Sequence, residues 1–235
     1  MGDFHSYVAS LIFTELQGLS VDEIKLNHKN KRNLAKSAGF AIAYGGSAST
    51  IAENCNIPLK DAENLYDGYF RAFPELKAYF EKHFKKTLKN GYILFNNFTG
   101  RKYFYNEENY YFKYKNELEE GTFWNEIGDP IAFKMARKAK GEISRKSQNF
   151  PIQGSSSDIS KYALILVFKE ILKQNLLNVV LIGNFVHDEI VLDVPEHLAE
   201  EWAIILQDCM EQAGKPFCPI IPLKAEAVIS DYWGH

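Results

Sequence analysis

The segment from Val179 to Val194 limits the possible folds most strongly. Two runs of β-branched and aliphatic residues flank the polar triplet His187-Asp188-Glu189. Branched side chains fit a pleated strand, so the pattern predicts a β-hairpin with the triplet at its turn. A histidine beside two carboxylates suits a metal ion, although the same residues also suit an ordinary solvated turn.

Amphipathic helices are predicted over most of the chain before this hairpin. Apolar residues recur at helical steps, which predicts helices at residues 4–16, 31–44, 47–55, 58–73 and 74–88. Ser20 and Glu23 have the spacing of a capping box, which predicts a further short helix.

Strands and helices alternate in the later part of the chain. The predicted elements are a hairpin at 91–105, a basic helix at 134–140, helices at 158–175 and 196–214, and a last strand at Ile220–Ser230. The fold class is therefore α+β. Two subdomains are expected, residues 1–140 and residues 141–235.

Composition narrows the class of protein. The net charge of -3 gives no overall basic field, so a nucleic-acid site must be a local patch. Cys55, Cys209 and Cys218 are odd in number and widely spaced, which predicts reduced thiols. The first residues do not resemble a signal peptide, and no stretch approaches the ~20 apolar residues of a membrane span. We therefore expect a cytoplasmic protein.

Four side chains spaced by four residues give the segment 31–44 an unusual face. Arg32, Lys36, Phe40 and Tyr44 share one slowly winding stripe, because each step of four residues drifts by only ~40°. The cations can bind phosphates, and the aromatic rings can stack on a sugar and a base. The alternative is a solvated basic turn followed by aromatic residues that pack in the core.

Three motifs in this order resemble family A DNA polymerases, the DNA polymerase I group. They are Arg-x3-Lys-x3-Phe-x3-Tyr-Gly at 32–45, Arg-x3-Asn-x3-Gln-Gly at 145–154 and Val-His-Asp-Glu at 186–189. Shorter matches are Asp3-Phe-His5, Phe73-Pro74, Gly100-Arg101-Lys102 and the ending Tyr232-Trp233-Gly234-His235. The resemblance implies the helical fingers and the antiparallel-sheet palm of a right-hand polymerase, as the first and second subdomains.

The resemblance also assigns roles to single residues. The incoming dNTP would contact His5, Arg32, Lys36, Phe40 and Tyr44. Primer-template DNA would contact Arg145, Asn149 and Gln153, whose side-chain donors suit the minor-groove acceptors that every base pair presents. His187 would contact the primer terminus. Asp188 would bind metal and Glu189 would support the catalytic site, in a mechanism that uses two Mg²⁺ ions.

One family motif is missing. The family carries its first catalytic aspartate in an Asp-Tyr-Ser-x-x-Glu strand, and no Asp-Tyr-Ser occurs in this sequence. The thumb and the N-terminal part of the palm are expected to lie upstream as well. The resemblance therefore implies an upstream segment or a partner chain, as in a split polymerase, and an isolated chain with little activity. It also implies a protein of a bacterial cell, with a phage as an alternative source of the gene. Residues 105–129 are expected to be an irregular insertion.

Two other functions fit parts of the pattern. The single-subunit RNA polymerases share the helix motif. Their pattern resembles this sequence less well, because it has Tyr at the position of Phe40 and Ser at the position of Glu189. A non-catalytic DNA-binding or assembly subunit could descend from a polymerase half. The enzyme is favoured by the intact set of motif residues, which are Arg32, Lys36, Tyr44, Gln153 and Asp188.

Overall fold

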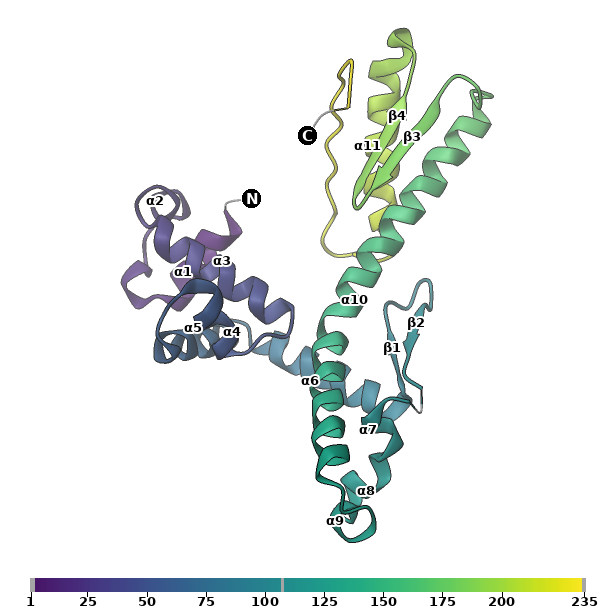
Figure 1. The fold of residues 1–235 in the computed structure, drawn as a ribbon. Helices are drawn as coiled ribbons and strands as arrows, with labels where there is room; N and C mark the ends of the chain where they lie inside the picture. Colours follow the sequence, from purple (N-terminus) through teal and green to yellow (C-terminus); the bar gives the residue numbers. More distant parts are fainter. Residues whose placement is uncertain (1–2, 107, 234–235) are drawn as a thin grey trace. The chain divides into compact units, whose positions relative to one another are not determined.

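The structure is a computed structural model that describes residues 3–106 and 108–233 (Figure 1). Its contacts form two compact units. Unit 1 is Met1–Ile93 with Lys102–Phe150, and unit 2 is Leu94–Arg101 with Pro151–His235. The assignment of residues 1–140 to fingers and 141–235 to palm stays a prediction.

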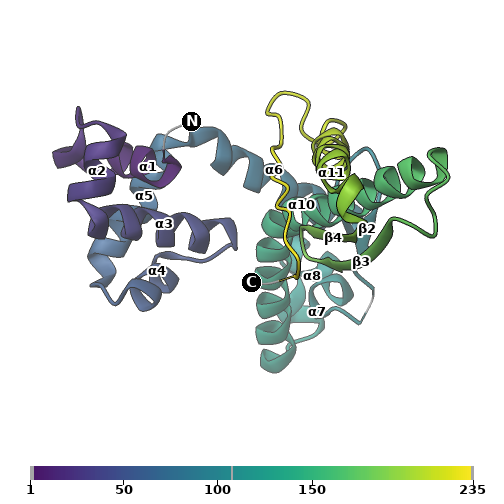
Figure 2. The same ribbon diagram turned by 90° about the horizontal axis from the view of Figure 1, so that it is seen from above.

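Unit 1 begins with helices packed around one apolar core (Figure 2). They are α1 (Phe4–Ile12), η1 (Thr14–Leu16), α2 (Val21–Asn27), α3 (Lys29–Ala43), α4 (Ala48–Cys55), α5 (Leu59–Ala72) and α6 (Pro74–Asn90). The core includes Leu16, Ile24 and Ile51, which are fully buried. The predicted capping of α2 is present, because the Ser20 side chain accepts a hydrogen bond from the Glu23 backbone N–H at 3.2 Å.

A two-stranded ribbon and three short helices follow α6 along the chain, and the ribbon includes residues of both units. They are β1 (Tyr92–Leu94), β2 (Lys102–Phe104), α7 (Tyr110–Lys113), α8 (Lys115–Glu120) and α9 (Phe123–Glu126). The hairpin prediction is confirmed by the pairing of β1 with β2. The expected irregularity of residues 105–129 is wrong in part, since they form three short helices in which Tyr111 and Phe123 are buried. That these residues are an insertion stays a prediction.

Helix α10 runs from Pro130 to Lys173 and contributes residues to both units. The sequence predicted separate helical segments here. Pro151 lies inside the helix, but a proline removes only one backbone donor and its ring is buried. Packing of the flanking turns, which bury Ile143 and Val167, outweighs that local cost.

Unit 2 places the predicted hairpin against two helices (Figure 1). Strands β3 (Leu181–Val186) and β4 (Glu189–Asp193) are antiparallel, and η2 (Glu196–Leu198) leads into α11 (Ala199–Gly214). The core between them includes Val167 and Ile171 of α10, Val180, and Trp202 and Cys209 of α11.

The predicted last strand is wrong. Ile220–Ser230 is extended chain without strand pairing in the part of unit 2 that the structure describes, and Ile220 and Val228 are exposed. Leu223 packs against Gly214, and Lys224 pairs with Glu211 at 3.1 Å, so side chains hold this segment on α11. The three cysteines are free thiols. In the described ranges, we find no helix with the length and apolar character needed to cross a membrane.

Candidate functional site

The outer face of α3 carries the predicted cationic and aromatic stripe. Phe40 and Tyr44 are 52% and 56% exposed, and Lys36 is exposed beside them. The opposite face of the helix is buried through Ala35, Ala38, Ala41 and Ile42. The alternative that the two aromatic residues pack in the core is therefore wrong.

Arg32 begins the stripe in a pair with Asp3. The Arg32 Nε and Nη2 atoms each donate to an Asp3 carboxylate oxygen at 2.7 Å, while the same carboxylate caps α1 by accepting from the Ser6 backbone N–H at 2.9 Å. The hydrogen bonds from Arg32 and Ser6 hold the pKa of Asp3 far below its usual range. The pair fixes the start of α1 on α3, and leaves Arg32 with Nη donors beyond those that Asp3 accepts.

The same contact brings His5 to the stripe. The His5 ring centroid lies 6.0 Å from that of Phe40, and the Lys36 Nζ lies 5.9 Å from the Phe40 ring centroid. Burial is the main cause that lowers the pKa of His5; nearby Arg32 and Lys36 lower it further and Asp3 opposes them. Four predicted nucleotide-binding residues thus meet at one place, with two permanent cations and a neutral imidazole near pH 7.

The end of α3 contacts α10. Gly45 has a φ of +74°, and a Cβ at this residue would lie only 2.9 Å from the Arg145 Cα, so the chain needs glycine for both reasons. The Asn149 amide donates to the carbonyl of Ala43 at 3.4 Å, a group that the helix end leaves without an intrahelical partner. Tyr44 therefore lies beside the helix face that carries Arg145 and Asn149.

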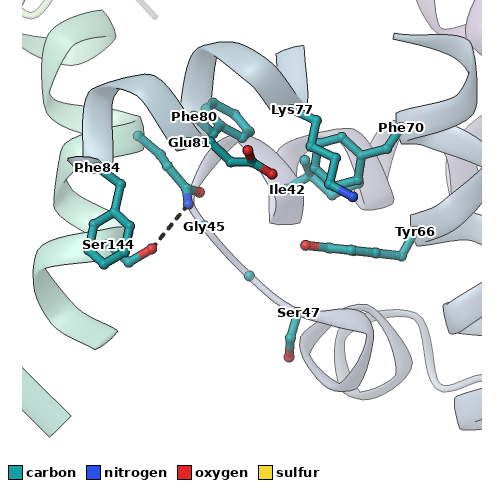
Figure 3. A pocket seen from close by; sticks show the side chains of 12 residues that line it. Ile42, Gly45, Ser47, Tyr66, Phe70, Lys77, Phe80, Glu81, Phe84 and Ser144 are labelled. Atoms are coloured by element: carbon teal, nitrogen blue, oxygen red, sulfur yellow. Dashed lines mark hydrogen bonds between the residues drawn. The ribbon is translucent and has the colours of Figure 1, made fainter. Parts of the chain in front are cut away.

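A pocket of about 390 Å³ opens next to this junction (Figure 3). Aromatic side chains provide much of its wall, and Gln148 donates to the Ser144 hydroxyl at 3.4 Å at one edge. Its lining residues are Ile42, Gly45, Gly46, Ser47, Tyr66, Phe70, Lys77, Phe80, Glu81, Phe84, Ser144 and Gln148. The turn after Tyr44 thus has a cavity behind it that can take a flat apolar group with polar edges.

In unit 2, His187 and Asp188 form the two-residue turn between β3 and β4, since Val186 pairs with Glu189. His187 has a φ of +53°, a conformation that costs a residue with a Cβ about 1 kcal/mol or more. Asp188 is exposed and makes no hydrogen bond or ion pair within the described part of unit 2. The predicted turn is confirmed, and its carboxylate points to no protein partner.

Glu189 differs from Asp188 because it is held from the side. The Trp233 indole N–H donates to the Glu189 carboxylate at 2.8 Å, which fixes the C-terminal segment beside the hairpin. The predicted family-like ending is thus represented by Tyr232 and Trp233, while Gly234 and His235 lie outside the described residues.

Sequence reasoning missed a polar cluster around Asp158. This buried carboxylate accepts from the Asn96 amide, the Thr99 hydroxyl and an Arg101 Nη, each at 2.8 Å. Desolvation raises the pKa of Asp158, but these donors and the charge of Arg101 outweigh it and lower the pKa overall. In the sequence, the one indication of this cluster was the family match Gly100-Arg101-Lys102, which contains Arg101.

The cluster fixes residues 94–101 on α10 next to Gln153. Arg101 also donates to the carbonyl of Gly154 at 2.9 Å, and its guanidinium carbon lies 4.4 Å from the Phe95 ring centroid. A Cβ at Gly154 would lie 2.5 Å from that ring. Gln153 is exposed on this rigid support.

The donor set at the hairpin suits a hard divalent cation only in part. Mg²⁺ prefers carboxylate oxygens and keeps several water ligands, and the exposed Asp188 carboxylate fits that preference. The described residues hold no group of three or more His, Cys, Asp or Glu side chains that could bind a metal ion. Asp3 is no substitute, because Arg32 and Ser6 occupy its carboxylate.

The family follows from comparison with known proteins. A family model described as DNA polymerase family A matches residues 1–235. The chain belongs to this family. Its polymerase-like α+β fold is also found in the POL domain of Pol1 from M. smegmatis, solved in complex with DNA primer-template and dNTP. That domain is 25% identical with a TM-score of 0.67, over 90% of this chain and 31% of the other.

Similar sequences are DNA polymerases I. The enzyme of Aquifex aeolicus is 29% identical, over 98% of this chain and 33% of its own length. The thermostable enzyme of Thermus aquaticus is 27% identical, over 98% of this chain and 23% of its own length. This family A chain thus spans a third or less of these relatives.

Proposed function

We propose that this chain supplies the nucleotide-binding region and one catalytic carboxylate of a DNA-directed DNA polymerase. The enzyme would transfer a nucleotide from a dNTP to a primer 3′-hydroxyl under template direction. The contact of Gly45 with Arg145 carries the proposal, because it sets the exposed face of α3 beside the polar face of α10 within one unit. Cations and rings suited to a nucleotide thus lie next to donors suited to a base pair.

The face of α3 would bind the dNTP. The Lys36 ammonium and the remaining Arg32 donors bind phosphate oxygens, and His5 adds an imidazole at the same place. The exposed Phe40 ring packs against the sugar, and Tyr44 lies against the templating base pair. The Asp3–Arg32 pair orders this surface before the nucleotide arrives, which lowers the entropy cost of binding.

The face of α10 and the hairpin would bind primer-template DNA. Arg145, Asn149 and Gln153 offer donors to the acceptors of the minor groove, which occupy similar places in every base pair. The contact would therefore test pairing without reading sequence. His187 at the turn would contact the primer terminus.

Asp188 would hold Mg²⁺, and Glu189 would support the site from its bond to Trp233. The bound Mg²⁺ would supply Lewis-acid chemistry, which would activate the primer 3′-hydroxyl and stabilise the leaving pyrophosphate. The chain's own contribution is a carboxylate at a turn of fixed conformation. The second carboxylate would come from an upstream segment or a partner chain.

Unit 2 has surfaces suited to such a partner. Among the described residues β3 pairs only with β4, so each strand has an outer edge that can accept another strand. A two-stranded sheet is marginal alone. Ile165, Phe168 and Leu172 form an exposed apolar row on α10, which the rest of a palm would cover.

Nucleotide binding tests the first half of the proposal. A dNTP titration of the chain with primer-template DNA and Mg²⁺ should give an affinity that falls about tenfold in Lys36→Ala, since a charge-assisted contact is lost. Lys60→Ala is the matched control, because this exposed lysine lies on α5. Equal affinities in all three proteins would contradict the proposed nucleotide site.

Reconstitution tests the second half. The chain mixed with a polypeptide that carries an Asp-Tyr-Ser-x-x-Glu segment, thumb and palm should extend a primer, whereas the chain alone should not. Robust extension by the chain alone, abolished in Asp188→Ala, would disprove the need for a partner.

A further inference from the structure

Four cations occupy the first turns of α10 with no acidic residue among them. They are Lys134, Arg137, Lys138 and Lys140, between Asp129 and Glu142. The proposed function uses none of them. Because α10 continues to Arg145 and Asn149, the direction of each cation on the helix decides whether it can share a ligand with the DNA-binding face.

Helical geometry divides the four cations into two pairs. At about 100° per residue, Lys134, Lys138, Arg145 and Asn149 fall within a sector of roughly 60°. Arg137 and Lys140 point elsewhere, and both lie over aromatic rings. The Arg137 guanidinium carbon is 5.9 Å from the Phe133 ring centroid, and the Lys140 Nζ is 5.4 Å from that of Tyr111.

Lys134 and Lys138 are exposed, and neither makes a hydrogen bond or an ion pair in the described ranges. The nearest acid toward the DNA-binding face is Glu142, which pairs with Lys146. The Lys146 hydrogen bond is the main cause that lowers the pKa of Glu142. The carboxylate is thus largely neutralised by its own partner, and the charge of the sector stays positive.

Gly141 leaves the sector open between Lys138 and Arg145. A Cβ at Gly141 would lie 3.8 Å from the Arg145 Nη1, so the guanidinium extends over this glycine toward the start of the helix. The cations therefore form a row, which rises about 6 Å from Lys134 to Lys138 and about 10 Å more to Arg145. Exposed Ile131 and Met135 flank the row on one side.

We propose that Lys134 and Lys138 extend the DNA-binding face of α10 into a track for single-stranded nucleic acid, which binds the phosphodiester backbone of the template before it reaches Arg145. The inference rests on the proposed function, since it needs primer-template DNA at Arg145 and Asn149. A row of cations beside exposed apolar side chains suits a strand whose bases are unpaired. Asp129 caps the first turn and ends the track, because its carboxylate accepts from the Ile131 backbone N–H at 2.8 Å.

The track predicts that affinity depends on the length of the template overhang. Fluorescence anisotropy with labelled hairpin DNA should give tighter binding as the 5′ overhang grows from none to about four nucleotides or more. The double variant Lys134→Gln with Lys138→Gln should lose most of this gain. For this variant, the slope of the logarithm of the binding constant against the logarithm of the salt concentration should be smaller in magnitude by about 1.4. Each phosphate contact on a single strand contributes roughly 0.7 to that slope, and two contacts are lost.

The matched control is Arg137→Gln with Lys140→Gln. It removes the same two charges from the same turns of α10, but from the sides that face the aromatic rings. This control should keep the overhang-dependent gain. Equal losses in the two double variants would overturn the track, because they would indicate a general charge effect, and so would a wild-type affinity that ignores overhang length.

The two proposals fail separately. Nucleotide binding that depends on Lys36, together with DNA binding that ignores the overhang, would reject the track and keep the proposed function. Binding of overhangs through Lys134 and Lys138, together with dNTP binding that is unchanged in Lys36→Ala, would support the track and reject the proposed nucleotide site.

Discussion

The face of α3 and the tip of the β3–β4 hairpin carry the two halves of the proposed chemistry, and they are built differently. On α3 the charged groups already have partners within unit 1, since Arg32 holds Asp3 and His5 lies against Phe40. At the hairpin Asp188 is exposed without a hydrogen bond in the described part of unit 2. The proposed nucleotide surface is thus ordered by contacts within unit 1, whereas the proposed metal ligand has no such contacts in the described part of unit 2.

The two regions differ in whether protein contacts hold their charged side chains in place. A cationic surface repels itself, so the Asp3 carboxylate and the buried face of α3 keep its side chains in place. A carboxylate that ligates a cation needs at least one oxygen that no protein group occupies, and both oxygens of Asp188 meet this condition in the described part of unit 2. Substitutions should therefore affect stability at α3 and chemistry at the hairpin.

The largest effect is expected for Asp188→Asn. Primer extension by the reconstituted enzyme should fall about a thousandfold or more, because loss of a metal ligand removes several kcal/mol of transition-state stabilisation. The thermal unfolding midpoint should not change, since the side chain is exposed. Asp193→Asn, at the exposed end of β4, is the control and should keep its activity. A lower unfolding midpoint for Asp188→Asn would contradict the expectation that substitutions at the hairpin tip affect chemistry and not stability.

Gly45→Ala should have the largest effect on stability. The new Cβ meets the Arg145 backbone in a residue of positive φ, so the free energy of unfolding should fall by about 2–4 kcal/mol. Gly91→Ala has a similar φ of +71° with nothing within 4 Å, and should cost only about 1 kcal/mol. Chemical denaturation measures both. Equal losses would mean that the contact between α3 and α10 is loose.

Asp3→Ala should have a smaller effect, which Ser20→Ala calibrates. Each substitution removes the N-cap of a helix, worth about 1 kcal/mol. Only Asp3→Ala also removes the partner of Arg32, so its loss should be larger at neutral pH. The pKa of Asp3 is lowered by folding, so its contribution is present above its usual pKa of 3.8 and is lost as the pH falls below it. Equal losses in denaturation at pH 7 would mean that the pair contributes nothing.

The smallest effect is expected for His5. Folding lowers the pKa of His5, mainly through burial, so the unfolded chain binds more protons as the pH falls through 6.5. The folded state should therefore lose some stability below this pH, and His5→Gln should reduce that slope, while His83, whose pKa burial also lowers, should keep part of it. His197→Gln, at an exposed histidine of η2, should leave it unchanged. Urea titrations between neutral pH and pH 5 measure the difference.

The α3 face could be predicted from the sequence because its signal is local. Residues four apart must share a helix face, and the caps and glycines around it mark its limits. The hairpin was equally clear, since branched residues flank a polar turn. In both cases the side chains that matter lie within about a dozen residues of each other.

Features that depend on residues far apart in the sequence were either not predicted or predicted wrongly. Asp158 meets Asn96 and Thr99 across about sixty residues of chain, and no local pattern announces that contact. Ile220–Ser230 has the composition of a strand, but a strand also needs a neighbour to pair with, and side-chain contacts with α11 hold it instead. The helical segments predicted separately at 134–140 and 158–175 belong to one helix that continues through Pro151.

The backbone of His187 has a consequence for engineering. A chain selected only for resistance to heat would place glycine at this turn, because glycine adopts a φ of +53° without steric cost. With the proposed role of His187 at the primer end, activity and thermostability would compete at this position. Stabilising substitutions in this protein should be sought on the helical scaffold and not at the hairpin tip, where a gain in melting temperature would remove the imidazole proposed to meet the primer end.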